Sequence, residues 1–111
     1  MTEGTKVLKV TDDTFVDQIE QGKGLTIVDF WAEWCGPCRI VGPIVNQLAD
    51  KYADRGVRVG KVDVDQNPET ASRFGIRSIP SILFFKDGQH VDTVIGAVPK
   101  AHLEQKLEEH L

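Results

Sequence analysis

The sequence lacks several features that would place it in other classes of protein. Its longest apolar stretches, residues 25–32 and 79–85, are interrupted and far shorter than the roughly 20 residues of a membrane-spanning helix. Basic residues are in deficit, because 13 Lys and Arg stand against 17 Asp and Glu and give a net charge of -4. No basic stripe is present to neutralise phosphates. We therefore expect neither membrane insertion nor nucleic-acid binding.

The chain also lacks internal repeats, low-complexity segments and linkers rich in Gly, Ser or Pro. Its 111 residues are about the size of one domain, and 41% hydrophobic and 27% charged residues are close to the globular average. Residues 1–6 contain no apolar segment of a secretion signal. These features predict a single domain over residues 1–111, located in the cytoplasm. A monomer is expected because no large apolar stripe is left over.

Cysteine is scarce, but its two occurrences, Cys35 and Cys38, form a C-x-x-C pair. In a reducing compartment such a pair is more often catalytic or metal-binding than structural. A zinc site would need further ligands from His90, His102 or His110, and the sequence gives no sign that these converge on the cysteines. A purely structural disulfide would close a loop too small to restrict the unfolded chain much. We interpret the pair as redox-active, with a zinc-bridged dimer left as an alternative.

The order of apolar runs and turn signals predicts the elements β-α-β-α-β-α-β-β-α. Layer packing then gives an α/β fold with helices on both faces of a central sheet. The strands are expected at residues 7–10, 25–31, 57–64, 81–86 and 89–95, the last two joined by an Asp87-Gly88 turn. The helices are expected to start at Thr11, after Cys35, at Pro68 behind an Asn67 cap, and near Pro99 with Leu103, Leu107 and Leu111 on one stripe.

The cysteines lie between a buried strand and a long amphipathic helix, and this position bears on their chemistry. Unpaired backbone N–H groups and the helix dipole stabilise an anion at a helix N-terminus. The pKa of Cys35 is therefore expected to be lowered, which makes Cys35 the nucleophile. Cys38, one turn further on, is expected to be more buried, to keep a higher pKa and to act as the resolving thiol. Pro43 is expected to kink this helix by removing a backbone donor.

Two charged residues stand inside predicted buried strands. Asp29 would be costly to bury without a partner, so we interpret it as a carboxyl group with a raised pKa that exchanges a proton near Cys38. The simpler alternative is a carboxylate at a strand end that reaches solvent. Lys61 could likewise be an edge lysine that extends into water, and the sequence leaves its pairing with Asp29 open.

Two further residues near the motif have alternative interpretations. Trp34 lies in the loop beside the reactive cysteine, which favours an exposed docking surface over a core position. Pro80 starts a strand without another turn signal, and most such prolines are trans and structural.

The chain resembles the thioredoxin family over nearly its whole length. The motifs that carry the resemblance are Trp31-Ala32-Glu33-Trp34-Cys35-Gly36-Pro37-Cys38, Val28-Asp29-Phe30, Asp65-Gln66-Asn67-Pro68, Gly75-Ile76-Arg77-Ser78-Ile79-Pro80-Ser81, Phe84-Phe85-Lys86-Asp87-Gly88 and Ile95-Gly96-Ala97. A lone C-x-x-C is a weak signal, but this ordered set is very specific. The resemblance implies the thioredoxin fold, a central five-stranded mixed sheet flanked by four helices. It also implies that the strand from Ser81 and its hairpin partner run antiparallel to the others.

The resemblance further implies roles for individual residues. The Ile79-Pro80 peptide would be cis and lie against the disulfide, while Asp29 would be the buried proton-transfer group with Lys61 as its neighbour. Gly36 and Pro37 would complete the active-site loop, and the absence of His between the cysteines implies a reductant. An apolar docking surface is implied at Trp34, Val64, Ile79, Pro80, Ile95, Gly96 and Ala97.

By this resemblance the chain is a general protein-disulfide reductase with no bound cofactor. The Cys35 thiolate would attack a substrate disulfide, and Cys38 would resolve the mixed disulfide. Electrons would come from NADPH through a separate flavoprotein, thioredoxin reductase, because the chain has no nucleotide-binding motif. Two alternatives are a redox-gated binding subunit that holds its partner at Trp34 without turnover, and a disulfide oxidase or isomerase of the same fold.

Overall fold

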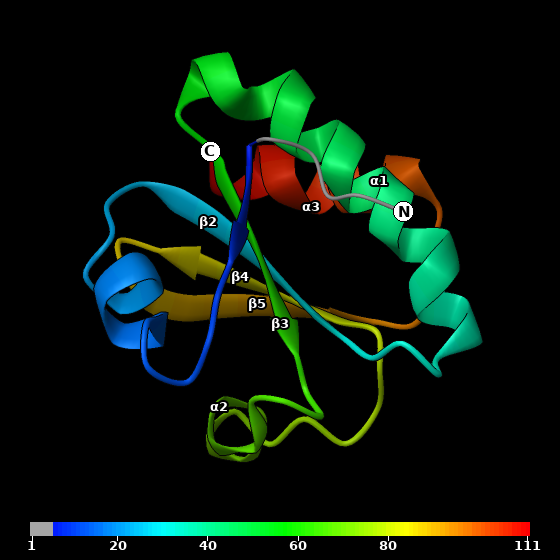
Figure 1. Ribbon diagram of the computed structural model, residues 1–111. Helices are drawn as coiled ribbons and strands as arrows, with labels where there is room; N and C mark the ends of the chain where they lie inside the picture. The colour runs from blue at the N-terminus through cyan, green and yellow to red at the C-terminus, as the bar shows by residue number, and fades with distance from the viewer. Residues whose placement is uncertain (1–5) are drawn as a thin grey trace.

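The computed structural model describes residues 6–111 and contains a five-stranded sheet in the order β1-β3-β2-β4-β5 (Figure 1). Residues 1–5, on which most of the argument about a secretion signal rests, lie outside the described residues. The strands are β1 (Val7–Lys9), β2 (Leu25–Trp31), β3 (Arg58–Asp63), β4 (Ser81–Lys86) and β5 (Gln89–Ile95). The helices are α1 (Gly36–Tyr52), α2 (Pro68–Arg73) and α3 (Lys100–His110), with a π-helical turn η1 (Val16–Glu20) and a 3₁₀ turn η2 (Ala53–Arg55).

The sheet is mixed, with β2 at its centre, as the continuous apolar run of that strand predicts. β3 pairs with β1 and β2 in parallel, and β4 pairs with β2 antiparallel. β5 is antiparallel to β4 alone, so it runs in the same direction as β2. The expectation that both hairpin strands oppose the other three is therefore wrong for β5, because the short Asp87-Gly88 turn reverses the chain once more.

Two cores lie on opposite faces of the sheet, because alternate residues of a strand point to opposite sides. Ile27 of β2 packs in the core that contains buried residues of α1 and α3, such as Val45 and Leu103. Val28, the next residue, packs in the other core, which includes Ile19 of η1. Figure 1 shows α1 and α3 on one side of the sheet and α2 on the other. The α/β layer prediction is thus confirmed.

The first predicted helix is shorter than its sequence pattern indicates. Residues 12–14 form turns, and η1 is a single π-helical turn, although Phe15 and Ile19 are buried as expected. The carboxylate of Asp12, the residue after the predicted start at Thr11, accepts hydrogen bonds from the backbone of α2. Its Oδ1 lies 2.8 Å from the Thr70 nitrogen, and its Oδ2 lies 3.3 Å from the Glu69 nitrogen. A tertiary contact has therefore replaced the local cap.

The other helices differ from prediction only in detail. Asn67 precedes α2, but within the described residues its side chain makes no bond to the N-terminus of that helix. Its Oδ1 accepts from the Asp12 backbone nitrogen at 2.9 Å. Leu103 and Leu107 of α3 are buried, whereas Leu111 lies beyond the helix and is 40% exposed. The predicted apolar stripe therefore ends one turn early. No helix in residues 6–111 combines the length and apolar character that crossing a membrane requires.

Candidate active site

Cys35 and Cys38 occupy the N-terminus of α1, just after the carboxyl end of β2. Cys35 is the N-cap residue, with extended backbone angles of φ -88 and ψ 108, and its Sγ accepts a hydrogen bond from the Cys38 nitrogen at 3.2 Å. The non-helical cap brings the two Cα atoms to 5.3 Å, within the range a disulfide requires, and the two sulfurs are bonded. The predicted cap position of Cys35 is confirmed.

The expected difference in burial between the two cysteines is wrong. Cys35 is 4% exposed and Cys38 is 5% exposed. Cys35 is covered because it packs with Ala32 and with the partly buried Ile79. The carbonyl oxygen of Ile79 lies 3.7 Å from the Cys35 Sγ. The loop before β4 therefore closes over a sulfur that a cap position alone would leave more open.

That loop contains the cis peptide bond between Ile79 and Pro80 that the family resemblance implied. Pro80 is buried, and its carbonyl oxygen accepts a hydrogen bond from the Gly96 nitrogen at 2.9 Å. Ile95, the residue before Gly96, pairs with Ser81 across the β4–β5 ladder. Residues far apart in the sequence are thereby brought together beside the disulfide.

The rim of the site is apolar and partly open to solvent. Trp34 is 68% exposed, and Ile95 is 60% exposed. The Trp34 indole nitrogen donates to Asp65 Oδ2 at 2.8 Å, which fixes the ring next to the segment that contains Val64. Val64 and Ile79 are partly buried and pack against the cluster that contains both cysteines. Of the predicted docking residues, Val64 and Ile79 thus lie against the cysteines, whereas Trp34 and Ile95 are exposed to solvent.

Asp29 and Lys61 lie side by side on β2 and β3, where they are register partners. Asp29 is 1% exposed and Lys61 is 9% exposed, so neither is the solvent-reaching side chain of the alternative interpretation. Both residues line an open cavity of about 700 Å³, together with Cys38. The Lys61 Nζ donates to the Gly42 carbonyl oxygen of α1 at 3.5 Å. A buried carboxyl group and an ammonium group therefore border the same cavity as the second cysteine.

Asn46 of α1 also lines this cavity, and sequence analysis missed it. It is only 8% exposed. The helical pattern singled out the apolar positions that flank it, so a polar residue on the buried face carried no weight. The available signal was its spacing of four residues from Gly42, which places both on one side of α1.

The histidines take part in other contacts. The His90 Nε2 lies 2.7 Å from the Thr93 hydroxyl, and the His110 Nε2 lies 2.9 Å from Asp92 Oδ2. Among residues 6–111, no group of three or more His, Cys, Asp or Glu side chains is arranged to hold a metal ion. The zinc alternative therefore gains no support from the described part of the chain.

Comparisons with known proteins agree with this geometry. A family model described as Thioredoxin matches residues 6–109. The chain belongs to the thioredoxin family. It is 54% identical to Thioredoxin 1 of Synechococcus elongatus over 102 residues, which cover 92% of this chain and 94% of that protein. It is 52% identical to Thioredoxin 1 of Nostoc sp. over 103 residues, 93% of this chain and 95% of that protein.

A third relative is the Thioredoxin M-type, chloroplastic, of Pisum sativum, which is 46% identical over 110 residues, 98% of this chain and 63% of that protein. Thioredoxins are thiol-disulfide oxidoreductases that act through a redox-active cysteine pair without a bound cofactor. In this chain that pair is Cys35 and Cys38. The predicted family, fold and enzyme class are confirmed, and the roles of the individual residues stay predictions.

Proposed function

We propose that this protein is a general protein-disulfide reductase in which Cys35 is the nucleophile. The observation that carries the proposal is the cysteine pair at the N-terminus of α1 within an apolar, partly exposed rim. In the reduced protein the Cys35 thiolate attacks one sulfur of a substrate disulfide. A bond forms between Cys35 and that sulfur, the substrate S–S bond breaks, and the second substrate sulfur leaves as a thiolate that takes up a proton.

Cys38 then resolves the mixed disulfide. Its sulfur attacks the Cys35 sulfur, the Cys35–Cys38 bond forms, and the remaining substrate sulfur leaves. The proton of the Cys38 thiol passes to the carboxylate of Asp29, which borders the same cavity, with Lys61 beside it as a cation. The substrate gains two electrons and two protons, and the protein ends in the disulfide form described above.

The rim residues serve as the docking surface for disulfide-containing proteins. Trp34 and Ile95 offer exposed apolar area, and the loop that contains Pro80 lies against the sulfur of Cys35. Gly36 and Pro37 are exposed next to Cys35, where a larger or charged residue would interfere with an approaching chain. The remaining members of this surface are Val64, Ile79, Gly96 and Ala97.

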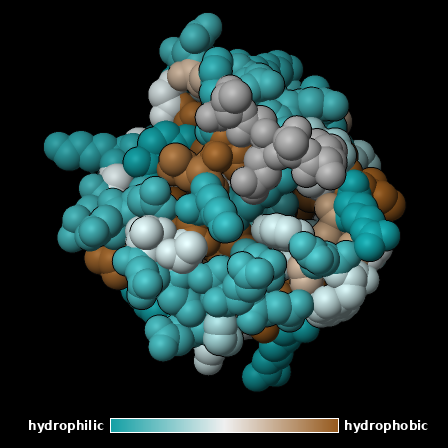
Figure 2. All heavy atoms as spheres, in the orientation of Figure 1, coloured by the Kyte–Doolittle hydropathy of each residue, from teal (hydrophilic) through white to brown (hydrophobic). Residues whose placement is uncertain are grey.

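The protein works in a cycle with a separate, NADPH-dependent thioredoxin reductase that returns the disulfide to the dithiol. We place this cycle in the cytoplasm and expect the chain to act as a monomer. Figure 2 supports the monomer, because hydrophilic residues cover most of the face in view and hydrophobic residues show only as small patches. Size-exclusion chromatography with light scattering checks this, and a dimer mass would contradict it.

Two cysteine variants test the mechanism with 5,5′-dithiobis(2-nitrobenzoate). The reduced wild-type protein should release a first thionitrobenzoate when Cys35 attacks and a second when Cys38 resolves. Cys38→Ser should release only the first and retain the adduct by mass, whereas Cys35→Ser should react far more slowly. If Cys35→Ser keeps its disulfide-reducing activity, the mechanism is wrong. The double Cys→Ser variant tests the binding-subunit alternative, which predicts that a partner is still held.

A further inference from the structure

The cavity beneath the disulfide contains a buried amide group that the proposed mechanism does not use. Asn46 of α1 is 8% exposed, and its Oδ1 has no hydrogen-bond partner among residues 6–111. A buried acceptor without a partner is destabilising, because it has lost its hydrogen bonds to water and gained none in the protein. Asn46 lines the same cavity as Cys38, Asp29 and Lys61, so we looked for a partner of its amide oxygen among the polar groups of that cavity.

The ammonium group of Lys61 lies against the same side of α1. The Lys61 Nζ donates to the Gly42 carbonyl oxygen at 3.5 Å, and a Cβ added to Gly42 would lie 3.6 Å from this nitrogen. Gly42 precedes Asn46 by four residues, so the two are neighbours on one face of the helix. An ammonium group offers three N–H donors, and the long bond to Gly42 engages one of them weakly.

The cavity is large enough to hold a water molecule, and part of its lining is polar, including Asn46 and Lys61. Rotation of the Asn46 amide toward the cavity lets such a water join its oxygen to the Lys61 ammonium. We propose that Asn46, through such a water, holds the Lys61 ammonium beside Asp29 and thereby positions the cation for the resolution step. Asn46 is thus a positioning residue, since it touches neither the cysteines nor the substrate. This inference rests on the proposed function, in which Asp29 accepts the proton of Cys38.

The proposal predicts an electrostatic effect. A cation held next to Asp29 favours its ionised form, which is the form that accepts a proton. Without the Asn46 acceptor, Lys61 would be held less firmly, and Asp29 would ionise at higher pH. The other charged groups that line the cavity are Lys9 of β1, Glu33 and Arg39 around the start of α1, and Asp63 of β3. These are common to all variants below, so differences between variants report on Asn46.

The test compares Asn46→Leu with Asn46→Gln in the two-phase thionitrobenzoate assay between pH 5 and 9. Asn46→Leu removes the acceptor at similar size and should slow the second release about threefold near neutral pH, with its pH midpoint raised by about half a unit. The first release, made by Cys35, should be unchanged. Asn46→Gln keeps an uncharged acceptor oxygen and should leave the second phase close to the wild-type rate. Gln47→Leu is the matched control, because it changes an exposed amide on the same helix.

A double-mutant cycle with Lys61→Met decides whether Asn46 acts through the cation. If it does, Asn46→Leu should have no further effect on the second phase once Lys61 is replaced. Additive effects, or equal slowing of both phases, would overturn the proposal. Should Asn46→Leu fail to fold, Asn46→Ala removes the same acceptor without adding bulk. If the cysteine variants behave as proposed but Asn46→Leu has no effect, this inference alone is contradicted. If Cys38→Ser still shows a second release, the proposed function is contradicted.

Discussion

Gly88 allows the tip of the β4–β5 hairpin to pack against η1. Its φ is +85°, and a Cβ at this position would lie 1.9 Å from the carbonyl oxygen of Glu20. The residue before it, Asp87, also has a positive φ of 50°, and its Oδ1 accepts from the Gly24 nitrogen at 2.7 Å. The Asp-Gly pair therefore serves both the turn conformation and a close backbone contact.

Gly88→Ala should therefore destabilise the protein more than a positive φ alone requires. The left-handed backbone costs about 1–2 kcal/mol for a residue with a side chain, and the clash with Glu20 adds about 1–3 kcal/mol. Gly56→Ala is the control, because its φ is +78° and no described atom lies within 4 Å of its added Cβ. Urea unfolding at pH 7 measures both variants. Equal losses would show that the contact with Glu20 relaxes without cost.

Individual residues were predicted well where a local rule decides their position. The Asp87-Gly88 turn is one example, and Cys35 at the helix cap is another, because both depend on neighbours in the sequence. The burial of Cys35 could not be foreseen, since its cover comes from Ile79, 44 residues further along the chain. Asn46 was missed for a related reason: only the folded sheet shows that its side of α1 borders Lys61.

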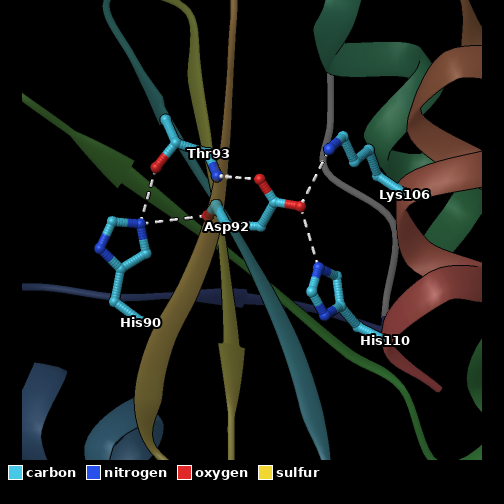
Figure 3. Close-up of polar contacts among 5 residues, drawn as sticks. All are labelled: His90, Asp92, Thr93, Lys106 and His110. Carbon is cyan, nitrogen blue, oxygen red and sulfur yellow. Dashed lines mark hydrogen bonds and ion pairs between the residues drawn. The ribbon is translucent and has the colours of Figure 1, made fainter.

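At the scale of elements, one carboxylate fastens α3 to the sheet. Asp92 of β5 accepts from the His110 Nε2 at 2.9 Å and lies 3.2 Å from the Lys106 Nζ, while the Thr93 nitrogen donates to it at 2.8 Å (Figure 3). The hydrogen bond from His110 is the largest cause that lowers the pKa of Asp92, and together these contacts bring that pKa to about 2. On the neighbouring strand, Lys86 donates to the His110 carbonyl oxygen at 2.9 Å, so the end of α3 is held at two points.

This arrangement predicts a specific loss of stability in acid. The pKa of Asp92 is lowered on folding from 3.8 to about 2, so its contribution is present above pH 3.8 and is lost as the pH falls through 2. Asp92→Asn should reduce the free energy of unfolding by about 1 kcal/mol at pH 7, after allowing for screening by water, and by much less near pH 2. Urea unfolding across this pH range tests the prediction. Asp50→Asn, on the exposed face of α1, should show no such trend.

The boundaries of helices and strands were predicted correctly where an apolar run ends at a clear turn residue. They were missed where a residue bonds to a distant element instead of to its own. The expected limits of β2, β4 and β5 match the structure, because their apolar runs end at clear turn residues. The first helix was overestimated, since Asp12 serves the N-terminus of α2 rather than its own segment. A sequence shows which residues can cap a helix, but the fold decides which helix they cap.

At the scale of the whole molecule, the sheet order explains why the site could be only partly predicted. Asp29 and Lys61 become partners because β3 lies between β1 and β2, and no local pattern determines that order. The same topology brings the Pro80 loop and the Gly96 turn to the N-terminus of α1. Family resemblance supplied these relations in advance, whereas residue patterns alone left both the pairing of Asp29 and the isomer of Pro80 open.

As a whole, the molecule is expected to donate electrons to its substrates rather than to take electrons from them. With Gly36 and Pro37, and no His, between the cysteines, we expect the disulfide to resist glutathione and to yield only to a strong dithiol such as dithiothreitol. An equilibrium titration against graded buffers of each reagent, read by thiol alkylation and mass, measures this. A low potential suits a protein that donates electrons to many disulfides. Full reduction by mild glutathione would instead favour the oxidase or isomerase alternative, because such a pair holds its electrons too firmly to pass them on.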